Sequence, residues 1–195
     1  MTMRALGPVL AGVTGAALVL GLRVGGDRLA QARAAEDKAV DTKAAAYAQL
    51  SSTMSQRPKD TEPLLVTMES NDALSGLTHS DKEDTSKIAV KTAGVYFIVA
   101  AAQVGKASGD DDAYVDIWLK QNGKDVDNSG CRQAIKDKSF TTVLVSQGIA
   151  ECKAGDVFSV AISASTPGKG LGIVAMKPKG EPVIPSIIFS MYKIN

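Results

Sequence analysis

Residue types that could carry chemistry are few and widely spaced in this chain of 195 residues. The single histidine, His79, lies in a polar stretch, and no motif supplies it with a nucleophile or with further metal ligands. The sequence contains no nucleophile elbow, phosphate-binding loop or dinucleotide fingerprint. We therefore expect His79 to be an exposed loop residue and the protein not to be an enzyme.

One acidic cluster, Asp110, Asp111 and Asp112, offers carboxylate oxygens of the kind that calcium prefers. Three consecutive side chains do not converge on one ion, however, and the spacing of a calcium-binding hand is absent. The competing interpretation is a solvated loop that keeps its neighbouring strands soluble. We expect no cofactor, with calcium as the weaker alternative.

The two cysteines, Cys131 and Cys152, could form one disulfide if the domain lies outside the cytoplasm. Closing a loop of about 20 residues would add about 3 kcal/mol to stability in the chain-entropy model. Two unpaired thiols are the alternative. The sequence has no closely spaced cysteine pair, which argues against a thiol redox site or a zinc cluster.

Charge and composition narrow the class of protein. The chain has 22 basic and 21 acidic residues, a balance that argues against binding to nucleic acid. Hydrophobic residues make up 45% and aromatic residues only 5%, which suits a β domain with small side chains plus an apolar helix. The length allows one domain and an appendage.

An uncharged run of 18 residues, Ala5–Leu22, is at the lower limit for a transmembrane helix, and we assign residues 1–26 to a membrane anchor. A cleavable signal peptide is the rival interpretation, but the one small-x-small site, at residues 32–34, lies about ten residues too far along. Small residues recur at every fourth position and would let the helix pack closely against another, although an Ala/Gly-rich helix has such spacing by chance. These are Gly7, Ala11 and Gly15.

Residues 27–57 are rich in Ala, Gln, Lys, Arg and Glu, which predicts a helical stalk. Val40, Tyr47 and Met54 recur at every seventh position, but charged residues interrupt the rest of the seam, so we predict no coiled coil. Pro58 cannot continue a helix, and we place the domain boundary there.

The remaining residues, 58–195, read as a β-sandwich of seven to nine short strands. The stretch 94–102 is apolar on both alternating faces, whereas 113–120 alternates cleanly between apolar and polar residues. Asn122 and Gly123 then supply the positive backbone dihedrals of a two-residue hairpin turn. No helical pattern interrupts these strands.

Three of these motifs together carry a family resemblance: Gly-Val-Tyr-Phe at 94–97, Leu-Lys-Gln-Asn-Gly at 119–123 and Gly-Asp-Val-Phe at 155–158. About residues 63–195 resemble the jelly-roll domain shared by the complement-subcomponent globular head and tumour necrosis factor. The resemblance implies a jelly-roll sandwich outside the cytoplasm that assembles as a trimer, and some members of that family bind calcium.

The charges that flank the apolar run at residues 5–22 favour a membrane orientation opposite to the one that the resemblance implies. Only Arg4 precedes the run, and the excess of basic residues behind it favours a cytoplasmic carboxyl-terminal side. Large domains translocate with little regard to such charges, and the resembled domains are extracytoplasmic. We therefore expect a single-pass membrane protein with its domain outside, despite the basic residues Arg23, Arg28, Arg33 and Lys38.

Self-association is the explanation we favour for strands that are apolar on both faces, at 95–104 and 187–194. A sandwich strand needs only one apolar face, so something must cover the other. In the resembled family a neighbouring subunit of the trimer does so, and loops of the same chain are the alternative. The candidate contact residues are Val95, Tyr96, Phe97, Trp118 and Tyr192.

Two functions fit this organisation. The first is a membrane-anchored, non-enzymatic jelly-roll protein that binds a protein or glycan surface through the loops at 69–87, 105–112 and 177–185. The second is a structural accessory subunit of a larger membrane complex, anchored by its one helix and capping the complex with its β domain. A fold alone does not decide between them.

Overall fold

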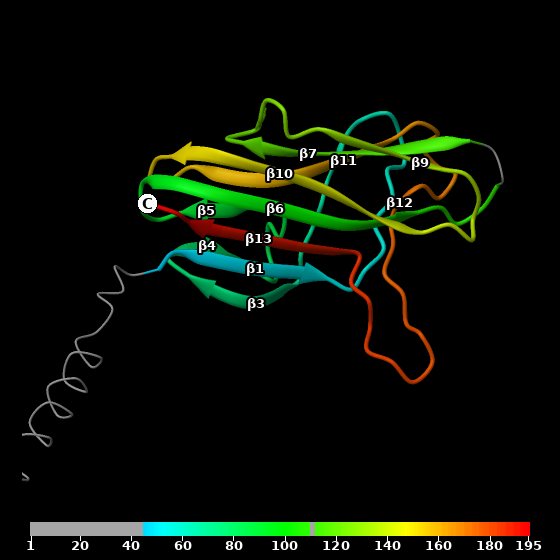
Figure 1. Ribbon diagram of the computed structural model, residues 1–195, viewed down its shortest axis with the longest axis horizontal. Coiled ribbons are helices and arrows are strands. Elements are labelled where there is room, and N and C mark those ends of the chain that lie inside the picture. Colours follow the sequence, from blue (N-terminus) through cyan, green and yellow to red (C-terminus); the bar gives the residue numbers. More distant parts are fainter. Residues whose placement is uncertain (1–44, 110–111) are drawn as a thin grey trace, which may run out of the picture. The chain divides into compact units, whose positions relative to one another are not determined.

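The structure, a computed structural model, describes residues 45–109 and 112–195 (Figure 1). Within these ranges the chain folds into two antiparallel sheets stacked as a β-sandwich, as the sequence predicts, and contains no helix. The sandwich belongs to a compact unit that spans Ala44–Asn195. Among the described residues, none forms a helix long and apolar enough to cross a bilayer.

The first sheet, which we call sheet A, has the strand order β10–β6–β13–β1–β3, and the short β12 pairs beside β6. Its longest strands, β6 and β10, pair along their whole lengths. The strands of sheet A are β1 (Tyr47–Ser52), β3 (Ser70–Ser75), β6 (Gly94–Gly105), β10 (Thr142–Cys152), β12 (Gly172–Ile173) and β13 (Ile187–Lys193).

The second sheet, sheet B, has the order β4–β5–β11–β7–β8, with β2 paired to β11 and β9 paired to β7. Its centre is the pair of β7 and β11. The strands of sheet B are β2 (Leu64–Leu65), β4 (Leu77–His79), β5 (Ile88–Val90), β7 (Ala113–Gln121), β8 (Lys124–Asp125), β9 (Cys131–Ile135) and β11 (Val157–Ala164).

The core lies between the two sheets and follows from alternation along each strand. Every second residue of β6 and β7 points into the core. Phe189 on β13 also points into the core. Full burial of one such large apolar side chain contributes about 1.5–3 kcal/mol. Fully buried members of the core include Ile98, Ile117, Leu119, Phe158 and Phe189.

The hairpin predicted at Asn122 and Gly123 is confirmed. These two residues connect β7 to β8 and have φ values of 52° and 78°, while Gln121 and Lys124 pair on either side. Positive φ at both central residues is the signature of a primed turn, whose twist matches that of the strands it joins.

The predicted helical stalk is wrong for the part that the structure describes. Residues 47–52 form β1, which is paired on both sides, with β13 and with β3. Ala48 and Leu50 face the core and are buried. Alanine and glutamine favour a helix locally, but pairing with two strands and burial of one face override that preference. The domain therefore starts before the boundary predicted at Pro58, and residues 1–44, which include the predicted anchor, lie outside the described residues.

The predicted loop at 69–87 is also more regular than expected. It contains β3 and β4, which extend sheet A and sheet B respectively. Both strands lie at sheet edges, but only β3 is polar and partly exposed, whereas Leu77 and His79 of β4 are buried.

Candidate interaction surface

The outer face of sheet A carries apolar side chains where a solvated sandwich would carry polar ones. On β6 the apolar residues that point away from the core are Val95, Phe97, Val99 and Ala101, and the polar Gln103 follows them on the same face. Their partners on neighbouring strands extend the surface in both directions, and we call the whole set the outer apolar face. Besides those four residues it comprises Tyr47, Val143, Val145, Ile149, Ile188 and Tyr192.

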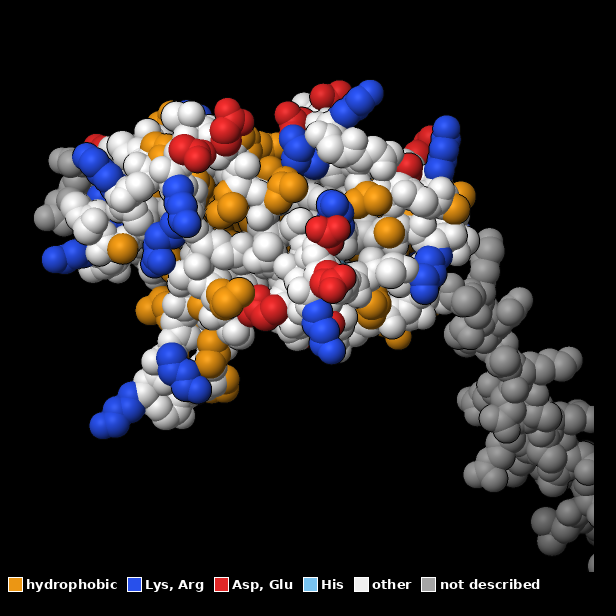
Figure 2. Space-filling view, turned by 180° about the vertical axis from the view of Figure 1, so that it is seen from behind, with side chains coloured by type: hydrophobic (Ala, Val, Ile, Leu, Met, Phe, Trp, Pro, Cys, Tyr) orange, Lys and Arg blue, Asp and Glu red, His pale blue; other side chains and the backbone are white. Residues whose placement is uncertain are grey.

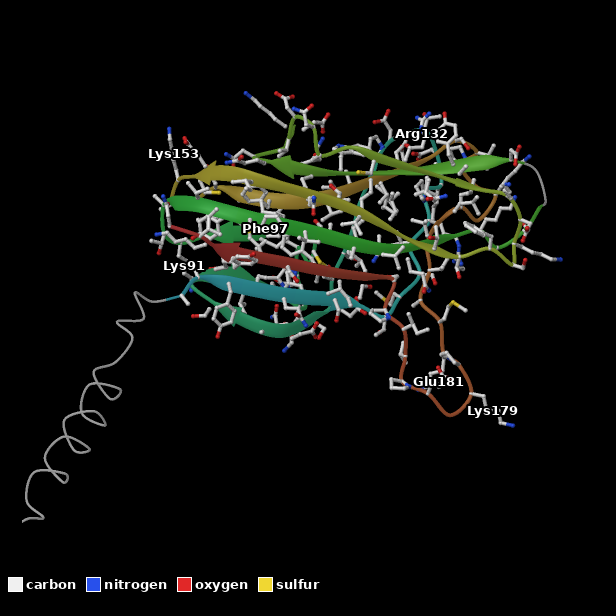
Figure 3. All side chains as sticks on the ribbon, viewed as in Figure 1. Lys91, Phe97, Arg132, Lys153, Lys179 and Glu181 are labelled. Carbon is white, nitrogen blue, oxygen red and sulfur yellow. The ribbon has the colours of Figure 1, made fainter. Side chains whose placement is uncertain are left out.

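One row crosses four strands of this face at matching register. Ile149 pairs with Phe97, Phe97 with Tyr192 and Tyr192 with Tyr47. The rings of Phe97 and Tyr192 lie with centroids 5.4 Å apart and tilted by 56°, a favourable aromatic contact. Ile149 is 64% exposed, Tyr192 47% and Tyr47 42%, so the row faces outward and no part of the chain that the structure describes covers it (Figure 3, where Phe97 is labelled).

Charge is nearly absent from this face. Neutral polar residues lie between the aromatic row and the row of Val145 and Ile188. Along the outward-pointing residues of β10 that the structure describes, the first charged one after Val143 is Glu151, at the margin of the face. Figure 2, seen from the opposite side of the molecule, shows basic and acidic side chains interspersed with smaller apolar patches. An uncharged aromatic and β-branched sheet face of this kind is typical of a contact surface.

The structure separates the five residues that the sequence analysis grouped as a contact. Val95, Phe97 and Tyr192 lie on the outer apolar face. Tyr96 does not, because alternation turns it into the core, where burial raises the pKa of its hydroxyl, which donates a hydrogen bond to the carbonyl of Thr92 at 2.8 Å.

Trp118 lies on the opposite sheet. It points outward from β7 of sheet B, and its indole Nε1 donates to Asp125 Oδ1 at 2.8 Å. Trp118 was a contact candidate without an assigned face, and the structure places it on the sheet opposite to Val95, Phe97 and Tyr192.

The acidic cluster is described only in part. Asp110 and Asp111 lie outside the described residues, and Asp112 is exposed beside a small hollow that Lys106 and Lys169 also line. Nowhere in ranges 45–109 and 112–195 do three or more His, Cys, Asp or Glu side chains gather as a metal site would require. Nearby lysines disfavour a cation, so the described residues lend the calcium alternative no support.

Both cysteines are free thiols in the structure, which favours the alternative of two unpaired thiols over a disulfide. Ser146 Oγ on β10 donates to the Ser129 carbonyl at 2.6 Å, which places the start of β9 beside the middle of β10. Cys152 ends β10 six residues farther on, roughly 20 Å away, whereas a disulfide needs Cα atoms within about 7 Å. Burial, together with the charge of Asp156, raises the pKa of the Cys152 thiol to about 11.

Asp156 connects the turns at one end of the sandwich. Its carboxylate accepts hydrogen bonds from Asn122 Nδ2 at 2.8 Å, from the Lys153 backbone N–H at 2.8 Å and from Gln121 Nε2 at 2.9 Å. These bonds, the one from Asn122 first, lower the pKa of Asp156 below its usual value. The network ties the β7–β8 turn to the start of β11.

His79 is buried and not exposed in a loop as the sequence predicts. It ends β4, where Nδ1 lies 2.7 Å from Asn71 Oδ1 and Nε2 lies 3.0 Å from the carbonyl oxygen of Thr85. Both ring nitrogens therefore connect segments of the fold, which gives His79 a structural role.

Sequence reasoning missed Ile149 and Tyr47, the two ends of the aromatic row. Ile149 follows Ser146, Gln147 and Gly148, which are not typical strand residues and so make the second half of β10 hard to recognise from sequence. Tyr47 falls in the segment that resembles a helix. Alternation from Val143 through Ile149 is the signal that would have found the first.

No protein-family model matches the sequence, and no curated protein matches it. The protein is therefore characterised by its own geometry, as a β-sandwich with one uncovered apolar sheet face.

Proposed function

We propose that the protein is a non-enzymatic, membrane-anchored jelly-roll module that self-associates as a trimer through the outer apolar face and serves in binding or assembly outside the cytoplasm. The observation that carries this proposal is the row of Ile149, Phe97, Tyr192 and Tyr47, exposed across four strands without a charge. A second copy presents the same uncharged surface, so association buries no unpaired charge.

The connectivity supports the jelly-roll assignment. From β6 onward the chain passes from sheet A to β7 and β9 of sheet B, returns to β10, crosses to β11 and ends in β13 of sheet A (Figure 1). Repeated crossing between two antiparallel sheets is how jelly rolls are built. The resembled family has this fold, and its members use a sheet face between subunits.

The size of the face also bears on the trimer. Residues 143–149 of β10 and the spacing of four strands give it dimensions of roughly 20 Å by 15 Å, or about 300 Å². That is within the range of the largest patches on monomers, which often have a function, but less than half of what one partner buries in a standard interface. We therefore expect loops at the rim of sheet A to complete the contact.

The membrane anchor in this proposal rests on the uncharged run at residues 5–22, and the location outside the cytoplasm rests on the resemblance. Both are independent of the sheet contact. Protease protection of the domain in sealed membrane vesicles tests the orientation, because a domain on the cytoplasmic side and one on the outer side differ in accessibility.

The test of self-association is the mass of the full chain in mild detergent, measured by sedimentation over a dilution series. We expect trimers that dissociate on dilution, and Ile149→Lys should shift the population to monomers because each contact would then bury an unpaired charge. Leu65→Lys is the matched control, since Leu65 is an exposed apolar residue of sheet B.

Two results would oppose the proposal: a wild-type monomer at every concentration, or equal effects of the two lysines. A monomer that instead copurifies with other membrane proteins would favour the accessory-subunit function.

A further inference from the structure

A hollow of about 590 Å³ opens on the outer face of sheet B, on the side of the sandwich opposite the outer apolar face. It lies over β7 and β9, beside the turn that joins β8 to β9. Its lining combines an aromatic ring, charged groups and small residues. The lining residues that matter here are Asp116, Trp118, Asp127, Asn128, Arg132 and Ser163.

Trp118 is the apolar wall of this hollow and is held in a fixed orientation. Its indole N–H donates to Asp125 Oδ1 at 2.8 Å, and the side chain is partly exposed to solvent. On β11 its register partner is Ala161, and the next outward residue toward the hollow is Ser163. Ala161 is fully buried, whereas Ser163 lines the hollow beside the ring.

The strongest charges in the hollow neutralise one another. Arg132 makes two hydrogen bonds to Asp116, at 2.7 and 2.9 Å, and its guanidinium carbon lies 3.7 Å from the centroid of the Tyr114 ring (Figure 3, where Arg132 is labelled). Lys120 pairs with Asp125. These pairs fix their side chains in place and leave little net charge for an ionic ligand.

Three polar side chains remain available. Asp127, Asn128 and Ser163 make no side-chain hydrogen bond to the part of the chain that the structure describes. The turn that carries the first two is nevertheless anchored, because Ser129 Oγ donates to the Val126 carbonyl at 2.7 Å and accepts from the Leu119 backbone N–H at 3.0 Å. Because the backbone of this turn is already held in place, it need not be ordered when a ligand binds.

We propose that this hollow binds a neutral saccharide. A sugar hydroxyl both donates and accepts, and the hollow offers acceptors on Asp127 together with donors on Arg132, Ser163 and Asn128. The C–H face of a sugar ring is apolar and matches the face of Trp118, as the polar and apolar parts of a small-ligand site usually match their ligand.

Ionic ligands fit less well. The one carboxylate without a basic partner in the described lining, Asp127, repels phosphate or sulfate, and a single exposed carboxylate holds a cation only weakly. A metal ion lacks the necessary cluster of ligands in residues 45–109 and 112–195.

The test uses tryptophan emission, because the chain has one tryptophan and it lines the site. The full chain is kept in a detergent without a sugar headgroup and titrated with maltose, cellobiose, lactose and N,N′-diacetylchitobiose up to tens of millimolar. We expect a saturable change with at least one of them. Asp127→Ala should weaken that binding by about tenfold or more, since hydrogen bonds to charged groups contribute about 1.5–3 kcal/mol.

Asp72→Ala is the matched control, an exposed aspartate on β3 of the other sheet, and should leave binding unchanged. The monomerising Ile149→Lys should also bind normally, so failure of self-association and failure of this proposal are distinguishable. Absence of a saturable response to all four sugars, an unchanged response in Asp127→Ala, or a response to a lysine-rich peptide in place of the sugars would overturn the proposal.

Discussion

Replacing Leu50 by alanine tests whether residues 47–52 are a strand of the sandwich or part of a stalk. Leu50 has no exposed surface and lies on β1 between two paired strands. Truncating a fully buried leucine costs about 3 kcal/mol or more, from lost burial and from the cavity that remains. Total stabilities are about 5–15 kcal/mol, so this loss is a large fraction.

The assay is urea unfolding of the full chain, followed by near-ultraviolet circular dichroism at one protein concentration, because association adds to apparent stability. With a slope of about 2 kcal/mol per molar urea, Leu50→Ala should lower the midpoint by about 1.5 M. Met54→Ala is the control. Met54 is 54% exposed just after β1. In a helical stalk, its recurrence at every seventh position would instead place it in the seam.

Equal midpoints for the wild type and Leu50→Ala, or an equal loss in Met54→Ala, would refute the strand assignment. A chain that begins at Pro58 gives a second readout. It lacks β1, which leaves β13 and β3 without their shared neighbour, and we expect it not to unfold cooperatively. A chain that begins at Ala45 keeps β1 and should unfold like the complete domain.

Three further changes test other parts of the sandwich. Iodoacetamide at pH 8 should label partly exposed Cys131 before buried Cys152, whose pKa of about 11 leaves it protonated, and peptide masses showing equal labelling would contradict this. Because the pKa of Asp156 is lowered in the folded state, its contribution is present above about pH 4 and is lost as pH falls through the folded pKa. Asp156→Ala should therefore lower the melting temperature at pH 7 and converge with the wild type near pH 2; a constant difference would exclude the carboxylate as the cause. Gly76→Ala should cost about 1–2 kcal/mol in thermal unfolding, since Gly76 has a φ of 64° and an added Cβ would lie 2.8 Å from Ala46 Cβ, and an unchanged melting temperature would contradict that close approach.

The sequence was a reliable guide where a strand carried its own pattern. The stretch 113–120 was expected to alternate between apolar and polar residues, and in β7 Ala113, Val115, Ile117 and Leu119 are buried while the residues between them are not. The turn at Asn122 and Gly123 was equally clear, because only a few residues adopt its backbone conformation. In both cases local chemistry and tertiary structure favour the same answer.

The sequence was an unreliable guide where tertiary contacts decide the local structure. The segment at β1 reads Tyr-Ala-Gln-Leu-Ser-Ser, in which alanine, glutamine and leucine are good helix formers, and only its partners β13 and β3 make it a strand. Tertiary contacts also decide which residues make up the outer apolar face. The sequence analysis named contact candidates on β6 and β13 without assigning their faces, and the structure places Tyr96, one of them, in the core.

The outer apolar face of sheet A and the hollow on sheet B are independent sites, because the free energy of covering the outer face differs between the two sheets. Covering the outer apolar face removes aromatic and β-branched surface from water at about 25 cal/mol per Å² and buries no charge. A protein that covered sheet B would bury the Arg132–Asp116 pair and the unpaired Asp127, and each ion would lose its hydration without a new partner. A second copy therefore suits sheet A, whereas sheet B suits a small polar ligand that can satisfy those groups by hydrogen bonds and leave them partly solvated.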